Sequence, residues 1–271
     1  RDKPYPFHLD VRAGPSTINA EGQVQHPFDL AQISGATRIS GPNLAQLYLL
    51  TGVALPTTPA YRLAANFQRS GSRYTFSHIS GTLGRSDLEG TLAVDRVKGR
   101  RRLDADLTSQ KLNFADLLTV LGGLPTHSAP APAPRRPKQI RLPIGQPAKP
   151  GSAPGRRVLP DAPIDAERLR AMDAQVSYRA RSITGGIFSV RRGALKLTLN
   201  QGVLTFDPLL LELAQGRISG RAAFDASGPV VKTSLDLRAD DIGLQQLFRQ
   251  HRSQPALEGE LEARARLAGQ G

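Results

Sequence analysis

Apolar and polar residues alternate one by one over several stretches of this chain. In residues 195–200, for example, three leucines alternate with lysine, threonine and asparagine. Successive side chains of a β-strand point to opposite faces, so this period predicts strands with one dry face and one wet face. Antiparallel sheets tolerate such an arrangement. The same alternation runs through 61–68, 209–214 and 257–267, and turn residues typical of hairpins stand at 69–71, 200–202 and 227–229.

Four short segments carry helix signals instead. Each begins at Asn, Asp or Pro and places apolar residues three or four positions apart. None is long enough to be stable alone in water, so we expect each to lie on the sheet or at its end. The predicted helices cover 42–50, 113–121, 165–172 and 241–251.

The chain also repeats itself at an offset of 130 residues. Gly90 corresponds to Gly220 (220 − 90 = 130), and Asp95 corresponds to Asp225. The same offset carries Leu107, Leu112, Phe114, Leu117 and Leu118 onto Leu237, Ile242, Leu244, Leu247 and Phe248. Repeated β units that cannot bury an apolar face alone stack into something longer. We therefore expect a mainly β fold: a curved, elongated antiparallel sheet, an open groove built from repeated units, with a few short helices.

A segment rich in proline, alanine and arginine divides the two copies. Residues 126–160 contain 9 of the 21 prolines, and every charge in them is positive. Such a stretch has too little apolar surface to offset the entropy of ordering it, and proline removes backbone donors. We predict a first β unit at 1–125, a disordered linker at 126–160 and a second unit at 161–271, truncated at its C-terminus. The linker is either a plain solvated spacer or a binder of anionic headgroups or of another envelope polymer.

Composition narrows the classes of function. The net charge of +13 comes mostly from arginine, which reflects either a GC-rich genome or attraction to nucleic acid or an anionic membrane surface. The 9 Phe and 5 Tyr are scattered and Trp is absent, so the stacking residues of a single-strand binder are missing. We do not expect nucleic acid as a partner. The absence of Cys excludes disulfides and thiolate sites.

Clusters of catalytic residues are missing from the sequence. The five histidines lie far apart without ligand-like spacing, and Asp104 and Asp106 alternate with apolar residues on a wet strand face. The glycines at 81, 84, 90 and 220 are better explained by turns and bulges than by a phosphate loop, because no Lys-Ser/Thr pair and no long helix follows. We expect no enzyme, no cofactor and no metal site.

Several strings of residues resemble a known family. ISGPNLAQL (39–47), LPTTPAYRL (55–63), ISGTLGRSDLEG (79–90) and LNFADLL (112–118) follow one another in the order of the C-terminal module of the bacterial AsmA family. LTFDPL (204–209) and GRISG (216–220) resemble the unit after it. The resemblance covers about 1–125 and 160–271.

This resemblance implies an envelope protein that moves phospholipid or another membrane lipid between the inner and outer membrane. It also implies a periplasmic β portion, held to the inner membrane by an anchor helix outside this fragment, and envelope protein partners. The family is similar in architecture to bridge-like lipid transfer proteins with repeating β grooves. No window here approaches the roughly 20 apolar residues of a membrane-spanning helix, and the chain starts without Met, so we expect a fragment.

The dry face of the strands is the candidate site. Either it lines an open groove for acyl chains, or it meets other side chains in the closed core of a scaffolding protein without lipid cargo, and the alternation is the same in both cases. The candidate groove residues are Tyr61, Leu63, Phe67, Leu92, Val94, Leu103, Leu107, Leu195, Leu197, Leu199, Leu209, Leu211, Leu213, Leu235 and Leu237.

Overall fold

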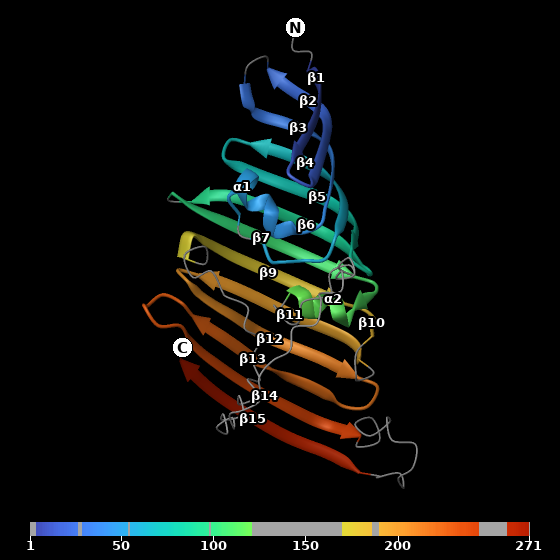
Figure 1. Cartoon of the computed structure of the whole chain (residues 1–271), viewed down its shortest axis with the longest axis vertical. Coiled ribbons are helices and arrows are strands. Elements are labelled where there is room, and N and C mark those ends of the chain that lie inside the picture. Colours follow the sequence, from blue (N-terminus) through green and yellow to red (C-terminus); the bar gives the residue numbers. More distant parts are fainter. Residues whose placement is uncertain are drawn as a thin grey trace, which may run out of the picture.

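A computed structural model of the chain describes residues 4–26, 29–53, 55–97, 99–120, 170–185, 190–243 and 259–270. Within these residues, 13 strands form one continuous sheet (Figure 1). In spatial order they are β1 (Tyr5–Ala13), β2 (Ser16–His26), β3 (Asp29–Gly41), β4 (Tyr61–Ser70), β5 (Arg73–Leu83), β6 (Ser86–Val97), β7 (Arg100–Ser109), β9 (Met172–Ala180), β11 (Val190–Asn200), β12 (Val203–Leu213), β13 (Arg217–Asp225), β14 (Lys232–Gly243) and β15 (Glu260–Gln270).

The remaining elements are short. Strands β8 (Leu112–Asn113) and β10 (Ile183–Thr184) form a separate parallel pair. The helices are a 3-10 turn, η1 (Leu44–Leu47), followed by α1 (Tyr48–Thr51), and α2 (Phe114–Val120). Figure 1 shows α1 and α2 in front of the sheet, with the strands stacked along the longest axis of the molecule.

The prediction of a mainly β, elongated and open sheet is confirmed, because the sheet runs from edge strand β1 to edge strand β15 without closing. One pair departs from the antiparallel expectation. Strand β9 runs parallel to β7, which makes the sheet mixed. Parallel neighbours need a long crossover instead of a tight turn, and residues 110–171 supply it here. The alternation of side chains carries no information about strand direction, so this pair could not be predicted from it.

The predicted hairpin turns are confirmed at their places in the sheet. Gly71 lies in the turn between β4 and β5, and the segment 226–231 joins β13 to β14. Gln201 and Gly202 both have positive φ, 50° and 85°, as a two-residue turn between twisted strands requires.

Two of the four predicted helices are confirmed, at 44–51 and at 114–120. Of the segment 165–172, residues 165–169 lie outside the described residues, Arg170 and Ala171 are helical as predicted, and Met172 begins β9. The prediction of a helix at 241–251 is wrong for Asp241–Gly243, since these residues complete β14, and Ile242 pairs with Leu261 of β15. Residues 244–251 lie outside the described part of the chain.

The sequence repeat corresponds to a repeat of strand pairing. Gly90 of β6 lies opposite Leu107 of β7, and Gly220 of β13 lies opposite Leu237 of β14. An irregularity between Phe76 and Ile79 in the β5–β6 pair recurs 130 residues later between Phe206 and Leu209 in the β12–β13 pair. The boundaries of the two units remain a prediction, and the segment 126–160 lies outside the described residues.

Candidate functional site

One face of the sheet carries a continuous line of apolar residues from edge to edge. Residues directly opposite each other on neighbouring strands share a face, so the pairing register can be followed from edge to edge. One such line crosses all 13 strands without a charged or polar side chain, and we call it the apolar row. It consists of Phe7, Gly22, Gly35, Phe67, Phe76, Leu92, Ala105, Val176, Leu197, Phe206, Ala222, Leu235 and Leu267.

All fifteen candidate groove residues lie on the face that carries the apolar row, according to the same register. Four of them are buried: Tyr61, Leu103, Leu199 and Leu213. The other eleven are half-buried: Leu63, Phe67, Leu92, Val94, Leu107, Leu195, Leu197, Leu209, Leu211, Leu235 and Leu237. The structure therefore brings the candidates together on one surface. Whether lipid occupies that surface remains a prediction.

Part of the apolar face is covered by the chain itself. Val53, which follows α1, packs in a cluster with Leu103 and Leu199. Phe114 and Leu117 of α2 pack on a second cluster around Leu112, Ala180, Ile183, Val190, Leu213 and Ile242. The buried candidates therefore contact protein, as the closed-core interpretation expects.

Other parts of the apolar face stay open in the structure. Tyr5 and Leu9 on edge strand β1 and Leu267 on edge strand β15 are 53%, 49% and 58% exposed. Tyr74 at the start of β5 is exposed as well. Sequence reasoning missed the row members Phe76 and Phe206, although the repeat places them at equivalent positions 130 residues apart.

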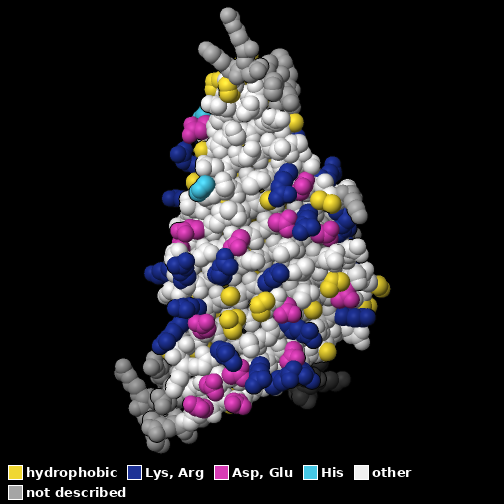
Figure 2. All heavy atoms as spheres, turned by 180° about the vertical axis from the view of Figure 1, so that it is seen from behind, with side chains coloured by type: hydrophobic (Ala, Val, Ile, Leu, Met, Phe, Trp, Pro, Cys, Tyr) yellow, Lys and Arg dark blue, Asp and Glu magenta, His cyan; other side chains and the backbone are white. Residues whose placement is uncertain are grey.

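The opposite face is polar and carries charges of both signs (Figure 2). Asp104 and Asp106 lie on it, as predicted, where they pair with Arg102 at 3.1 Å and with Arg179 at 2.7 Å. Asp236, which stands 130 residues after Asp106, pairs in the same way with an arginine of the next strand. These carboxylates therefore serve as ordinary surface ion pairs of a sheet.

The polar residues of the string 79–90 have a structural role. Asp116 of α2 is buried, and its Oδ2 accepts hydrogen bonds of 2.7 Å from both the Arg85 backbone N–H and the Ser86 hydroxyl. Gly84 lies in the same turn with φ of 64°, and a Cβ atom there would meet the Asp116 carboxylate. The prediction that this glycine forms a turn is confirmed: the string fastens the β5–β6 turn to α2.

A bidentate ion pair between an arginine and an aspartate links the parallel strands β7 and β9. Arg100 donates from Nε to Asp173 Oδ2 at 3.1 Å and from Nη2 to Oδ1 at 2.9 Å. The hydrogen bonds from this guanidinium lower the pKa of Asp173, and a backbone N–H from Gln201 adds to the effect. On the same pair of strands, burial raises the pKa of Tyr178, whose hydroxyl donates to Ser109 Oγ at 2.8 Å.

Within the described residues we find no group of three or more His, Asp or Glu side chains placed to hold a metal ion. Among the helices that the structure describes, none has the length and apolar character needed to cross a membrane.

Comparison with known proteins decides the family. A model of the AsmA family matches residues 4–271. The chain belongs to the AsmA family. It is 26% identical over 274 aligned residues to the AsmA family protein YhjG of Escherichia coli (strain K12). That alignment covers 99% of this chain and 39% of the relative, so the chain spans about two fifths of that protein's length.

No solved structure matches the chain. AsmA family proteins are associated with the cell envelope, which makes this chain an envelope protein of the family. The family is not a known family of enzymes.

Proposed function

We propose that this chain binds phospholipid acyl chains along its apolar face. It would act as the periplasmic part of an inner-membrane-anchored protein and conduct lipid between the inner and outer membranes. The observation that supports this is the apolar row, which crosses every strand of the 13-stranded sheet. A protein that only needs a closed core could bury its apolar residues without a row that continues across every strand. A path along which acyl chains move, by contrast, requires an apolar surface on each successive strand.

The energetic role of the row is to replace a membrane interior. Each methylene group that leaves an apolar environment costs about 0.8 kcal/mol, so a chain of roughly 16 carbons costs on the order of 13 kcal/mol in water. Leucine, valine and alanine side chains recover most of this without specific polar contacts. Their uniformity favours sliding over tight binding at one position.

The length of the row suits this role. Neighbouring strands lie about 4.8 Å apart, so twelve steps from β1 to β15 span about 58 Å. A bilayer has a hydrocarbon core of about 30 Å, of which one acyl chain occupies roughly half. The row is therefore longer than a single acyl chain, as a conduit requires.

Photo-crosslinking from matched positions tests the proposal. A photoreactive amino acid at Leu209 faces the apolar side of β12, whereas the same group at Leu210 faces the polar side, and both native side chains are half-buried. Expressed in a Gram-negative host, the first variant is expected to crosslink phospholipid and the second is not. Equal labelling at both positions, or no labelling at Leu209, would overturn the proposal.

Charged substitutions provide an independent readout. Leu197→Asp combined with Leu211→Asp places two carboxylates on the apolar face, and the amount of phospholipid that co-purifies should fall several-fold. Thr198→Asp combined with Leu210→Asp adds the same charge to the polar face of the same two strands. This matched pair should leave lipid recovery unchanged.

A scaffolding role without lipid cargo is the second candidate. The observation that favours it is the cover that Val53, Phe114 and Leu117 place on the apolar face. It predicts protein free of lipid in native mass spectrometry and no lipid crosslinks at Leu209. Detection of bound phospholipid in the unmodified protein would exclude it.

A further inference from the structure

The charged side chains on the apolar face are all arginines, and they lie together at one edge of the sheet. Among the paired strand positions whose side chains the structure describes, only Arg69, Arg96 and Arg101 bring a charge to this face. All three lie at the same edge of the sheet, where β4, β6 and β7 reach their ends near the β4–β5 and β6–β7 turns. We call them the rim arginines.

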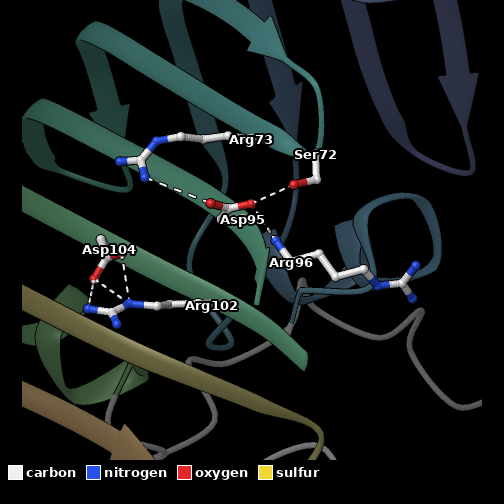
Figure 3. Close-up of polar contacts among 6 residues, drawn as sticks. All are labelled: Ser72, Arg73, Asp95, Arg96, Arg102 and Asp104. Atoms are coloured by element: carbon white, nitrogen blue, oxygen red, sulfur yellow. Dashed lines mark hydrogen bonds and ion pairs between the residues drawn. The ribbon is translucent and has the colours of Figure 1, made fainter. Parts of the chain in front are cut away.

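The neighbouring arginines on the polar face have partners. Arg73 lies 3.8 Å from Asp95, Arg102 lies 3.1 Å from Asp104, and Arg100 pairs with an aspartate of β9. Figure 3 shows the first two of these pairs.

Arg96 and Arg101 differ from these neighbours. Arg96 contacts Asp95 only through its backbone N–H, at 2.7 Å, and its guanidinium extends away from that carboxylate (Figure 3). Within the described part of the chain, neither Arg96 nor Arg101 forms an ion pair. The division follows the faces of the sheet: these polar-face arginines are neutralised by aspartate, and this pair on the apolar face is not.

Arg96 and Arg101 also stand directly opposite each other across β6 and β7. Like charges at such positions, with Cβ atoms about 5 Å apart, destabilise a sheet unless an anion lies between them. The guanidinium of Arg101 lies against Gly52, so close that a Cβ atom at position 52 would overlap it. Arg69 leans across the face, with its guanidinium carbon 5.1 Å from the centre of the Tyr74 ring.

We propose that the rim arginines bind the phosphate of an anionic phospholipid headgroup while its acyl chains lie on the apolar face. Guanidinium groups from two directly opposed strand positions can donate together to the oxygens of a phosphate diester. The next pair inward, Val94 and Leu103, is apolar, and the pair after it, Leu92 and Ala105, belongs to the apolar row. Headgroup and tail would thus meet adjoining surfaces. This inference rests on the proposed function and adds to it the class of lipid and its orientation.

A pair of charge-matched variants tests the inference. Arg96→Gln with Arg101→Gln removes two charges from the apolar face, and Arg73→Gln with Arg102→Gln removes two from the polar face of β5 and β7. Binding of a fluorescent phosphatidylglycerol is titrated at 150 mM salt, with phosphatidylcholine as the zwitterionic comparison. The rim variant should lose at least tenfold in affinity for phosphatidylglycerol, as expected when charge-assisted hydrogen bonds are removed. The polar-face variant should change by less than about twofold.

Equal losses in the two variants would overturn the inference, because they would indicate general charge attraction. An unchanged rim variant would overturn it as well, as would inorganic phosphate competing as strongly as the lipid. Arg96→Lys with Arg101→Lys keeps the charge and should give an intermediate affinity, which guards against a folding defect in the glutamine variant. Lipid crosslinks at Leu209 should persist in the rim variant. Their absence in the unmodified protein would instead contradict the proposed function itself.

Discussion

Gly90 lies so close to the carbonyl oxygen of Asp106 that a Cβ atom at position 90 would stand 2.1 Å from it. The second copy repeats this relationship, with 2.2 Å between a Cβ atom at Gly220 and the carbonyl oxygen of Asp236. Both glycines sit opposite a leucine of the next strand, and the equivalent residues are 130 positions apart. The repeated glycine therefore reflects a close backbone approach that excludes any side chain.

Alanine at either glycine should destabilise the sheet. Gly90→Ala also meets an unfavourable backbone, since φ is 146° at this position. We expect each substitution to cost about 2 kcal/mol or more of the free energy of unfolding, as overpacking and backbone strain do. Urea denaturation measures this. Gly269→Ala on β15 is the control, because nothing lies within 4 Å of its Cβ position, and it should be nearly neutral.

The buried carboxylate of Asp116 should matter more than exposed ones. Asp116→Ala leaves the Ser86 hydroxyl and the Arg85 N–H without their acceptor. We expect a loss of about 1.5–3 kcal/mol in unfolding free energy, the range for hydrogen bonds to charged groups. Asp106→Ala breaks only an exposed ion pair with Arg179 and should cost at most about 1 kcal/mol. Similar losses in the two variants would contradict a fastening role for Asp116.

Stability should fall in acid partly through Asp173. The hydrogen bonds from Arg100 lower its pKa in the folded protein. A lowered folded pKa means that the contribution is present above the unfolded value of about 3.9 and disappears as the pH falls through the folded value. Asp173→Asn should therefore be less stable than the unmodified protein at pH 7, by about 1 kcal/mol. The difference should shrink as the pH falls below the unfolded value and vanish once the pH is below the lowered pKa of the folded protein. Denaturation at a series of pH values measures it.

The control for this prediction is Glu262→Gln on β15. Glu262 is exposed and makes no ion pair with another described residue. Its stability at pH 7 should match that of the unmodified protein. A difference for Asp173→Asn that stays constant down to pH 2 would show that the ion pair with Arg100 is not its origin.

The segment after α1 should be anchored by Val53. This side chain is 4% exposed and packs against Leu103 and Leu199 on the apolar face. Val53→Ala should cost about 1–3 kcal/mol through lost burial and the cavity left behind. Val230→Ala, at a position that is 46% exposed, should be nearly neutral in the same denaturation experiment. If Val53→Ala were neutral too, the cover over this part of the face would be loose.

The alternation of residues predicted strands with one apolar face, and the register places all fifteen candidates on the same face. Leu209 and Leu210 show why, since adjacent residues in a strand must point to opposite sides. The helix at 241–251 failed at its start for a related reason. Asp241 and Ile242 carry a helix-like pattern, but Ile242 pairs with Leu261 of β15 and Asp241 lies in the irregularity before it, with φ of 53°. Tertiary contacts override local propensity here.

By itself, the sequence determined the strand faces, most of the turns and the 130-residue repeat, because each depends on residues close in the chain or on a simple period. Only the tertiary structure decided that β9 lies parallel to β7, that Val53 and α2 lie on the apolar face, and that Arg96 and Arg101 stand opposite each other with no ion pair to a carboxylate of the described residues. These relationships join residues across strand pairs and long connections. Their free energy comes from contacts in space, which no local pattern of residues encodes.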